Sequence, residues 1–398
     1  MGKRFTAVFR ENSPYKVFLI SLVVTGLGYG LYKGLIDNYL AEIVTMGEFD
    51  RGVLEFFREL PGLLLVFILA LFYTFSAETM YKIGALIMLA GMGMLSIVSP
   101  GKIIVTFAIA LHSLGEHIQL GMKNTLSLNY AKPGKGGAAL GQQNAVSQIG
   151  TLAGYLIVIA SFSVFAAYSP FRIFFGIAAG ILAVSALLSF RIKGKSETDD
   201  TKRRFYFRKK FTKYYMLEVF YGARKQVFFT FGPYVLIRFY GAGTSVISLL
   251  FAVTSIASFF LAPMVGKIID RVGYKTVMVA DTLILVIVCF FYGFAHHLFP
   301  MNVAFIVCCV NYVLDSVISM ASMASNVYVQ DLADSQDEVR ATISTGISVN
   351  HLITVFIALF GGWVWQTLGI EMLFILSAVL GLCNSAYAAT IKTNKGKH

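Results

Sequence analysis

The chain has 398 residues, of which 57% are hydrophobic and only 14% are charged, and its mean hydropathy is +0.72. A soluble domain of this length cannot bury so large an apolar fraction in its own core, so the composition excludes a soluble protein. The net charge of +12 is compatible with nucleic-acid binding, unless the basic residues follow the topology of a membrane protein.

Apolar runs of about 20 residues recur along the whole chain, each long enough to cross roughly 30 Å of hydrocarbon. The segment Met1–Lys16 is polar and basic and the first apolar run has full length, so we expect no cleavable signal peptide. Turn signals such as Pro100-Gly101 separate the runs. The sequence predicts an all-α membrane protein of about 12 transmembrane helices, at residues 15–40, 54–74, 80–98, 103–125, 140–166, 171–191, 214–238, 244–265, 276–297, 302–325, 342–365 and 370–391.

The basic residues concentrate on one side of the predicted membrane. With both termini inside, most of the 33 Lys and Arg residues fall in the inner segments, and the densest group lies between Arg191 and Lys213. Such a bias orients membrane proteins with the basic loops in the cytoplasm. We therefore predict a multi-pass protein of the cell inner (plasma) membrane with cytoplasmic N- and C-termini, and expect no nucleic-acid partner.

One long polar segment divides the chain. It contains basic residues interleaved with aromatic ones, as in Arg203-Arg-Phe-Tyr-Phe-Arg-Lys-Lys210. This pattern suits a cytoplasmic linker that lies on an anionic lipid surface, and a regulatory docking site is the alternative. The predicted domains are an N-terminal six-helix bundle at 1–190, the basic linker at 191–213 and a C-terminal six-helix bundle at 214–398.

The sequence gives little sign of cofactor or catalytic chemistry. Its four cysteines lie inside apolar runs without a C-x-x-C pair, so we expect neither disulfides nor a cysteine zinc site. His112, Glu116 and His117 have the order H-x3-E-H, which is not a zincin motif, and a metal site there is the weaker interpretation. Because no nucleophile elbow or glycine-rich phosphate loop is present, we predict neither an enzyme nor a cofactor.

A distinctive pattern follows the eighth predicted helix. It reads Gly266-Lys-Ile-Ile-Asp-Arg-Val-Gly-Tyr-Lys275 and resembles the G-x-x-x-D-[RK]-x-G-[RK]-[RK] loop of the major facilitator superfamily. Tyr274 departs from the pattern, and the equivalent loop of the first half has Tyr81 in place of the aspartate. A carboxylate and a cation beside a glycine turn can hold neighbouring helices in one state. The resemblance implies a conformational latch formed by Gly266, Asp270, Arg271, Gly273 and Lys275.

The resemblance also implies a fold of two pseudo-symmetric six-helix halves, with spans 1, 4, 7 and 10 around a central cavity. The ionisable residues inside the predicted helices fall largely on these same four spans. A charged side chain that faces lipid costs at least ~2.5 kcal/mol, so these groups must face protein or water. They are Lys33, Asp37, His112, Glu116, His117, Glu218, Arg224, Lys225 and Asp315.

Groups near the bilayer midplane are the candidate sites, because transporters place substrate and coupling ions there. Adjacent residues on a helix are about 100° apart, so Arg224 and Lys225 cannot both point squarely into one cavity. Oppositely charged pairs such as Lys33 and Asp37 can alternatively serve only to lock helices together. The candidate substrate-binding residues are Arg224, Lys225, Lys33, Tyr221 and Gln143, and the candidate proton-coupling residues are Glu116, Asp315, His112 and His351.

The predicted function is a secondary active transporter that works by alternating access, is proton-coupled and moves a small anionic or zwitterionic organic solute. Its expected partners are this solute, protons and the lipid bilayer, and we expect a monomer. One alternative is efflux of amphipathic compounds by proton antiport, which the 35 Phe, the 20 Tyr and a partial exporter pattern at Gly141, Gly150 and Gly154 favour. An alternative of another class is a non-transporting receptor or assembly factor on the same fold.

Overall fold

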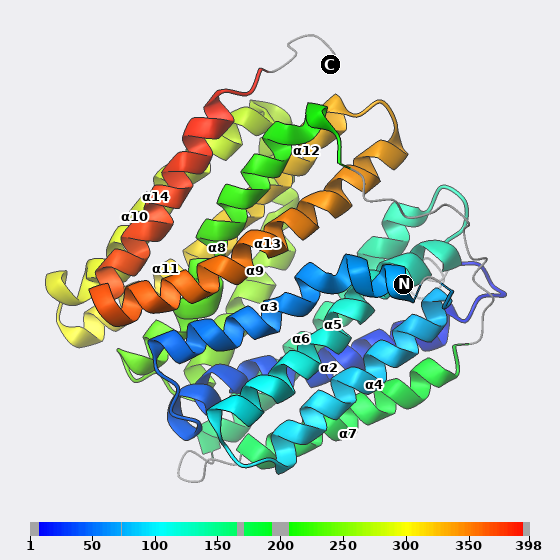
Figure 1. The fold of residues 1–398 in the computed structure, drawn as a ribbon, viewed down its shortest axis with the longest axis horizontal. Coiled ribbons are helices and arrows are strands. Elements are labelled where there is room, and N and C mark those ends of the chain that lie inside the picture. The colour runs from blue at the N-terminus through cyan, green and yellow to red at the C-terminus, as the bar shows by residue number, and fades with distance from the viewer. Residues whose placement is uncertain (1–7, 73, 165–170, 193–206, 393–398) are drawn as a thin grey trace. The chain divides into compact units, whose positions relative to one another are not determined.

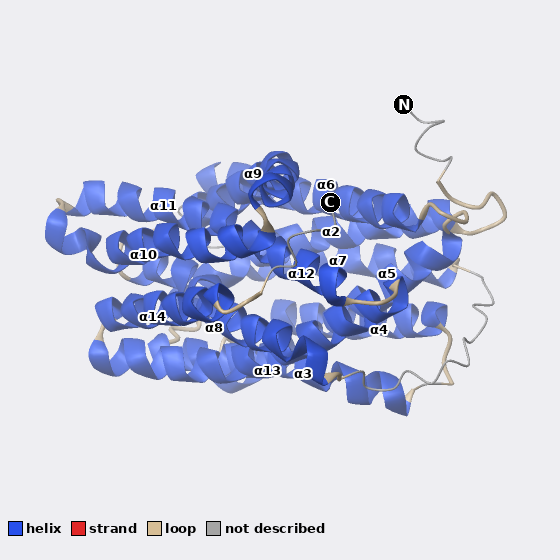
Figure 2. Ribbon diagram, turned by 90° about the horizontal axis from the view of Figure 1, so that it is seen from above, coloured by secondary structure: helices blue, strands red, loops and turns tan. Residues whose placement is uncertain are grey.

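The computed structural model describes residues 8–72, 74–164, 171–192 and 207–392 of the chain. Helices joined by short connections make up nearly all of this part (Figures 1 and 2). Outside the helices, an isolated antiparallel bridge pairs Phe9 with Ala131. Of the predicted linker at 191–213, residues 193–206 lie outside the described residues.

The described residues form twelve long helical segments. Those of the first half are α2 (Tyr15–Asn38), which continues into the π-helical turn η1 (Tyr39–Ile43), α3 (Glu48–Leu71), α4 (Ala77–Ile97), α5 (Lys102–Tyr130), α6 (Gly136–Val164) and α7 (Phe171–Phe190). Those of the second half are α8 (Thr212–Arg238), preceded by the short η2 (Lys209–Phe211), α9 (Thr244–Val272), α10 (Tyr274–Leu298), α11 (Met301–Ile318) with η3 (Ser319–Ser322) and α12 (Met323–Leu332), α13 (Gln336–Leu368) and α14 (Ile370–Ala389).

Ten segments of the described chain are long and apolar enough to cross a membrane. Helices α3 and α8 are as long as the others, with 24 and 27 residues, and differ from them in composition. The sequence of each contains several charged residues, which sets these two helices apart from the other ten. The prediction of an all-α, multi-pass membrane protein is confirmed.

Several helices extend beyond their predicted bounds, as α9 does by ending at Val272 rather than at residue 265. Helix α3 begins at Glu48 rather than at residue 54, so Arg51, which the sequence had placed outside the spans, lies on a helix. The tenth predicted span leaves α-helical geometry at η3 and continues to Leu332. Serines explain this change, because Ser322 and Ser325 donate hydrogen bonds to the carbonyl oxygens three residues earlier and thereby compete with the α-helical pattern.

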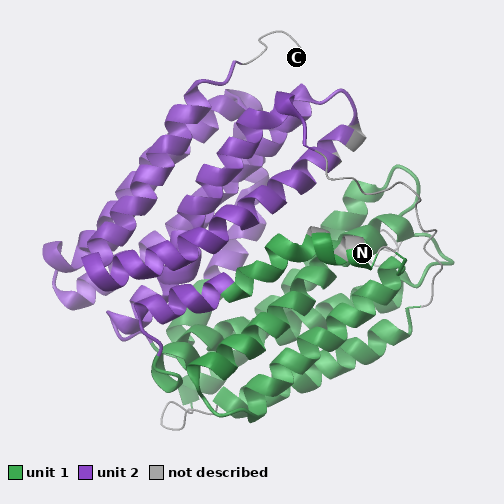
Figure 3. Cartoon of the chain, viewed as in Figure 1, with its two compact units in different colours: residues 1–45, 57–203, 243–252 green, residues 46–56, 204–242, 253–398 purple. Residues whose placement is uncertain are grey.

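The chain forms two compact units (Figure 3). Unit 1 contains residues 1–45, 57–203 and 243–252, and unit 2 contains residues 46–56, 204–242 and 253–398. Each unit therefore includes one short segment from the other half of the sequence. These segments are the first turns of α3, in unit 2, and the first turns of α9, in unit 1.

Small residues set the packing of α2 against α6 in unit 1. A methyl group added to Gly30 would lie 2.1 Å from the carbonyl oxygen of Thr151, and one added to Gly150 would lie 2.1 Å from that of Val23. Only hydrogen fits at such distances, so the two backbones approach closely. Close approach through glycine is the usual way in which helices associate inside a membrane.

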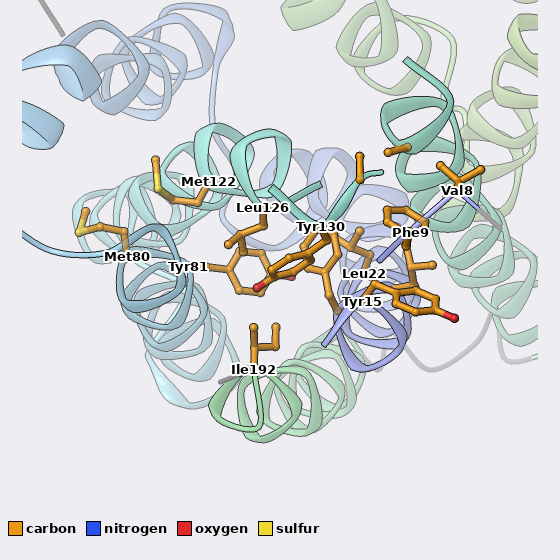
Figure 4. Close-up of a cluster of buried hydrophobic side chains, with 14 of the residues drawn as sticks. Val8, Phe9, Tyr15, Leu22, Met80, Tyr81, Met122, Leu126, Tyr130 and Ile192 are labelled. Carbon is orange, nitrogen blue, oxygen red and sulfur yellow. The ribbon is translucent and has the colours of Figure 1, made fainter. Parts of the chain in front are cut away.

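A buried aromatic cluster fixes one end of unit 1 (Figure 4). The ring of Phe18 on α2 packs edge-on against Tyr81 of α4 at 5.8 Å and against Tyr130 of α5 at 5.6 Å. The hydroxyl groups of Ser21 and Tyr81 form a hydrogen bond of 3.1 Å inside the same cluster. The cluster therefore holds α2, α4 and α5 in register, and α2 and α5 carry the candidate residues Lys33, His112 and Glu116.

Candidate functional site

Unit 1 contains a carboxylate without a counter-ion. Glu116 lies on α5 and is half-buried, and its side chain forms no hydrogen bond or ion pair with any residue that the structure describes. Its charge acts on Tyr29 of α2, Tyr155 of α6 and Lys123 of α5. Glu116 therefore lies close to two tyrosines of neighbouring helices and has no hydrogen-bond or ion-pair partner among the described residues.

His112 lies one turn before Glu116 on the same helix and is fully buried. Its Nδ1 lies 3.1 Å from the carbonyl oxygen of Met88, and because a carbonyl only accepts, Nδ1 carries the proton of the neutral ring. The other ring nitrogen, Nε2, is buried and has no partner in the described chain. The ring also packs against Tyr32 at 4.6 Å. His112 therefore keeps one nitrogen that can accept a proton.

Two candidate substrate residues of unit 1 already have protein partners. The Nζ of Lys33 forms a 3.0 Å ion pair with Asp37, which is buried, and lies 4.9 Å from the ring centre of Phe251. Gln143 is buried and donates a 2.8 Å hydrogen bond to Asn124. This geometry fits the alternative interpretation, in which Lys33 and Asp37 neutralise each other and lock the helix.

Unit 2 contains a buried arginine, Arg224 of α8. Its Nη2 forms an ion pair of 2.5 Å with Asp281 of α10, and both side chains are buried, with 3% and 7% exposed. The guanidinium lies 5.0 Å from the ring centre of Tyr221, whose hydroxyl donates to the carbonyl oxygen of Ser319 at 2.6 Å. Nη1 of Arg224 is buried and has no partner in the described chain. The site thus offers an unused hydrogen-bond donor on a fixed cation.

The two adjacent cations of α8 point in different directions, as the helical geometry predicts. Arg224 is buried, whereas Lys225 is exposed. Asp315 of α11 is buried and forms no side-chain hydrogen bond or ion pair within the described part of the chain, although the charges of Arg224 and Lys225 act on it. His351, the remaining candidate for proton coupling, lies half-buried on α13.

A small cavity of about 10 Å³ lies beside Tyr221 and Asp281, the two contacts of Arg224, with room for about one water molecule. Tyr221, Asp281, Ser325 and Asn384 contribute polar groups to its lining. The side-chain oxygen of Asn384 is buried and has no partner among the described residues. The surroundings of Arg224 are therefore polar, and some of their buried polar atoms have no hydrogen-bond partner in the described chain.

The loop of the family pattern has one glycine that the backbone requires. Gly273 separates α9 from α10 with a φ of 84°, which side chains rarely adopt. Gly266 instead lies inside α9, and an added methyl group would meet no atom within 4 Å. Helix α9 continues through Gly266 to Val272, so of the two glycines only Gly273 terminates it.

The charged residues of this loop differ in their partners. Asp270 and Arg271 are exposed and make no hydrogen bond or ion pair with the described residues. The Nζ of Lys275 donates to the carbonyl oxygen of Ile391 at 2.9 Å. Tyr274, the departure from the pattern, is buried and packs on the ring of Tyr328 at 5.5 Å. Where the family pattern has an arginine or lysine, this chain thus has a tyrosine that makes an aromatic contact within unit 2.

Unit 2 contains a buried ion pair that was not predicted from the sequence. Arg51 and Glu55 of α3 form a 2.8 Å ion pair in which the side chains are 3% and 0% exposed. Gln226 of α8 donates to the other oxygen of Glu55 at 3.1 Å. The i, i+4 spacing of Arg51 and Glu55 was the available signal. Asp281, the partner of Arg224, is likewise absent from the predicted site residues.

The sequence model of the Major Facilitator Superfamily matches residues 18–345 and 214–397 of the chain. The chain belongs to this superfamily. The predicted family and fold are confirmed. The family and the structural neighbours of this chain are transporters rather than enzymes. A search of curated proteins finds no match to the sequence.

Several solved structures share the fold at low sequence identity. The nucleoside transporter NupG superposes with a TM-score of 0.74 at 15% identity, over 95% of this chain and 99% of that one. A D-xylose-proton symporter gives 0.72 at 13% identity, over 96% and 98% of the two chains. A POT family transporter in complex with 5-aminolevulinic acid gives 0.71 at 11% identity, over 93% and 94%. At such identities the likeness shows the fold alone.

Proposed function

We propose that this chain is a proton-coupled secondary transporter that works by alternating access and moves a small anionic or zwitterionic organic solute. The observation that carries the proposal is Glu116, a half-buried carboxylate without a partner in the described chain. An unpaired charge in this environment costs free energy through desolvation, so it does not serve to stabilise the fold. A proton-coupled transporter, in contrast, needs a group that gains and loses a proton. The protein acts as a monomer in the cell inner (plasma) membrane, with both termini in the cytoplasm.

Glu116 is the proton-coupling residue of unit 1 in this proposal. The neighbouring His112 supports it, because its Nε2 is free to accept a proton from the same helical face. Asp315 is the corresponding carboxylate of unit 2. It is buried, the charges of Arg224 and Lys225 act on it, and its side chain forms no hydrogen bond within the described part of the chain. His351 completes the set of titratable groups.

The cationic residues of α8 bind the negative group of the solute in this proposal. Arg224 has an unused donor at Nη1, and guanidinium groups bind carboxylates and phosphates in fixed geometry. Lys225, Tyr221, Gln143 and Lys33 remain proposed substrate contacts, although Lys33 would first have to leave Asp37. One neighbour of the same fold holds 5-aminolevulinic acid, which has an amine and a carboxylate. This precedent supports a zwitterionic solute.

The proposal is tested by a solute screen in proteoliposomes, with and without an imposed pH gradient. Amino acids, small peptides, organic acids and phosphorylated metabolites make up the panel, and cationic dyes are included for the efflux alternative. We expect saturable, gradient-dependent flux of at least one anionic or zwitterionic solute. Flux of dyes alone would favour efflux of amphipathic compounds, and no flux of any solute would favour a non-transporting protein.

We further propose that residues 266–275 form a conformational latch whose turn is made by Gly273. Gly266 lies within α9 and takes no part in the turn, so the two glycines provide a matched test. Gly273→Ala is expected to lower the transport rate and to destabilise unit 2 by about 1–3 kcal/mol, because alanine is strained at this φ. Gly266→Ala is expected to leave both unchanged or to stabilise α9 slightly, since the site is open and helical. Transport rates and melting temperatures check this. Equal effects of the two substitutions would contradict the role of the turn.

A further inference from the structure

Three metal-binding side chains meet at one end of unit 2, and the proposed transport mechanism uses none of them. His296 and His297 lie in the last turn of helix α10, and Glu371 lies in the first turn of helix α14. Nε2 of His296 lies 3.2 Å from Oε1 of Glu371, and Nε2 of His297 lies 2.9 Å from the same oxygen. All three potential ligand atoms lie within 4.8 Å of one another.

These separations fit the coordination shell of a small divalent ion. Zinc binds histidine nitrogen and carboxylate oxygen at about 2.0–2.2 Å, so neighbouring ligands of a tetrahedral site lie about 3.3 Å apart. The two nitrogen-to-oxygen distances are close to this value without any movement of the backbone. Two histidines and one glutamate also form a ligand set that zinc uses in sites with an open fourth position.

The helix ends favour this arrangement electrostatically. The C-terminus of α10 carries a partial negative charge that attracts a cation, and the N-terminus of α14 stabilises the carboxylate of Glu371. The three side chains range from nearly buried to open, with 11% of His296, 28% of Glu371 and 58% of His297 exposed. One ligand is thus anchored in the protein while another remains accessible to an ion from solution.

The cluster lies between two neighbouring helices of unit 2, α10 and α14, where a bound ion would connect them. Lys275, at the opposite end of α10, already contacts the chain beyond the end of α14 at Ile391. An ion held by His296, His297 and Glu371 would join the same two helices at their other ends. On the predicted orientation this end of the unit faces away from the cytoplasm.

We propose that His296, His297 and Glu371 form a binding site for a divalent transition-metal ion such as Zn²⁺, which clamps α10 to α14. The nitrogen-rich ligand set selects against Mg²⁺ and Ca²⁺, which prefer oxygen. In the metal-free arrangement each Nε2 donates its proton to Oε1, so a metal ion can bind Nε2 once the proton of each neutral ring moves to Nδ1.

The test is a calorimetric Zn²⁺ titration of the purified full chain, prepared with an affinity tag that contains no histidine and stripped with a chelator. We expect saturable binding of one ion per chain, no response to Mg²⁺, and a melting temperature that rises by a few degrees with Zn²⁺. His297→Ala and Glu371→Gln should each weaken binding by at least about tenfold, since even outer-shell changes cost 10–100-fold. Both should remove the thermal shift.

Two matched variants serve as controls. His398→Ala removes another histidine and Cys383→Ser removes an exposed thiol, and neither should alter Zn²⁺ affinity. His297 is mostly exposed, so its removal leaves the packing of the unit intact and separates metal binding from folding. Unchanged Zn²⁺ affinity in both His297→Ala and Glu371→Gln, or no saturable binding to the native chain, would overturn the proposal.

Discussion

Glu116→Gln is expected to abolish the response of transport to a pH gradient while leaving solute exchange intact. A gradient of one pH unit supplies about 1.4 kcal/mol per coupled proton, which corresponds to a roughly tenfold concentration ratio of solute. Glutamine has the shape of the protonated carboxylate but cannot release a proton, so this ratio should fall to about one. Glu116 has no partner in the described chain, so the substitution should break no structural contact.

The measurement compares gradient-driven flux with counterflow in proteoliposomes that contain equal amounts of protein. Counterflow needs substrate binding and the conformational cycle but no net proton movement, so it reports the integrity of the variant. Glu11→Gln is the matched control, because Glu11 is an exposed carboxylate outside the helices. Full gradient-driven flux in Glu116→Gln would show that another group, with Asp315 as the first candidate, couples the proton.

Substitution of Arg224 is expected to have the largest effect on stability. Arg224→Met leaves Asp281 buried without its counter-ion, and breaking a buried ion pair in this way costs about 3–5 kcal/mol. The double variant Arg224→Met/Asp281→Asn removes both charges and should recover most of this loss, because replacing a buried pair by neutral groups is often nearly neutral. Thermal unfolding of the purified variants checks the order of stabilities.

The double variant also separates structure from function. If Arg224 binds the negative group of the solute, transport should remain lost although the fold has recovered. Asp281→Asn alone should be destabilising but should retain measurable binding, because the guanidinium is still present. Substrate binding to the double variant with native affinity would contradict the proposed role of Arg224 and leave it a purely structural residue.

Local features of the sequence were sufficient for the membrane architecture and the family. Apolar runs of sufficient length can satisfy their backbone hydrogen bonds in lipid only as helices, so hydropathy predicts the ten most apolar spans of the described chain. The pattern from Gly266 to Lys275 is equally local, and the family match confirms it. The early start of α3 was missed, because the charges that lower its hydropathy, including Arg51 and Glu55, are neutralised by each other inside the protein.

The sequence by itself therefore determined that the chain is a polytopic transporter-family protein with ionisable groups in its spans. Only the tertiary structure decided which of these groups are paired. Arg224 meets Asp281 from a distant helix, whereas Glu116 remains without a partner in the described chain. The physical reason is that hydropathy and turn signals act over a few residues, while the partner of a buried charge is set by how helices far apart in the sequence pack together.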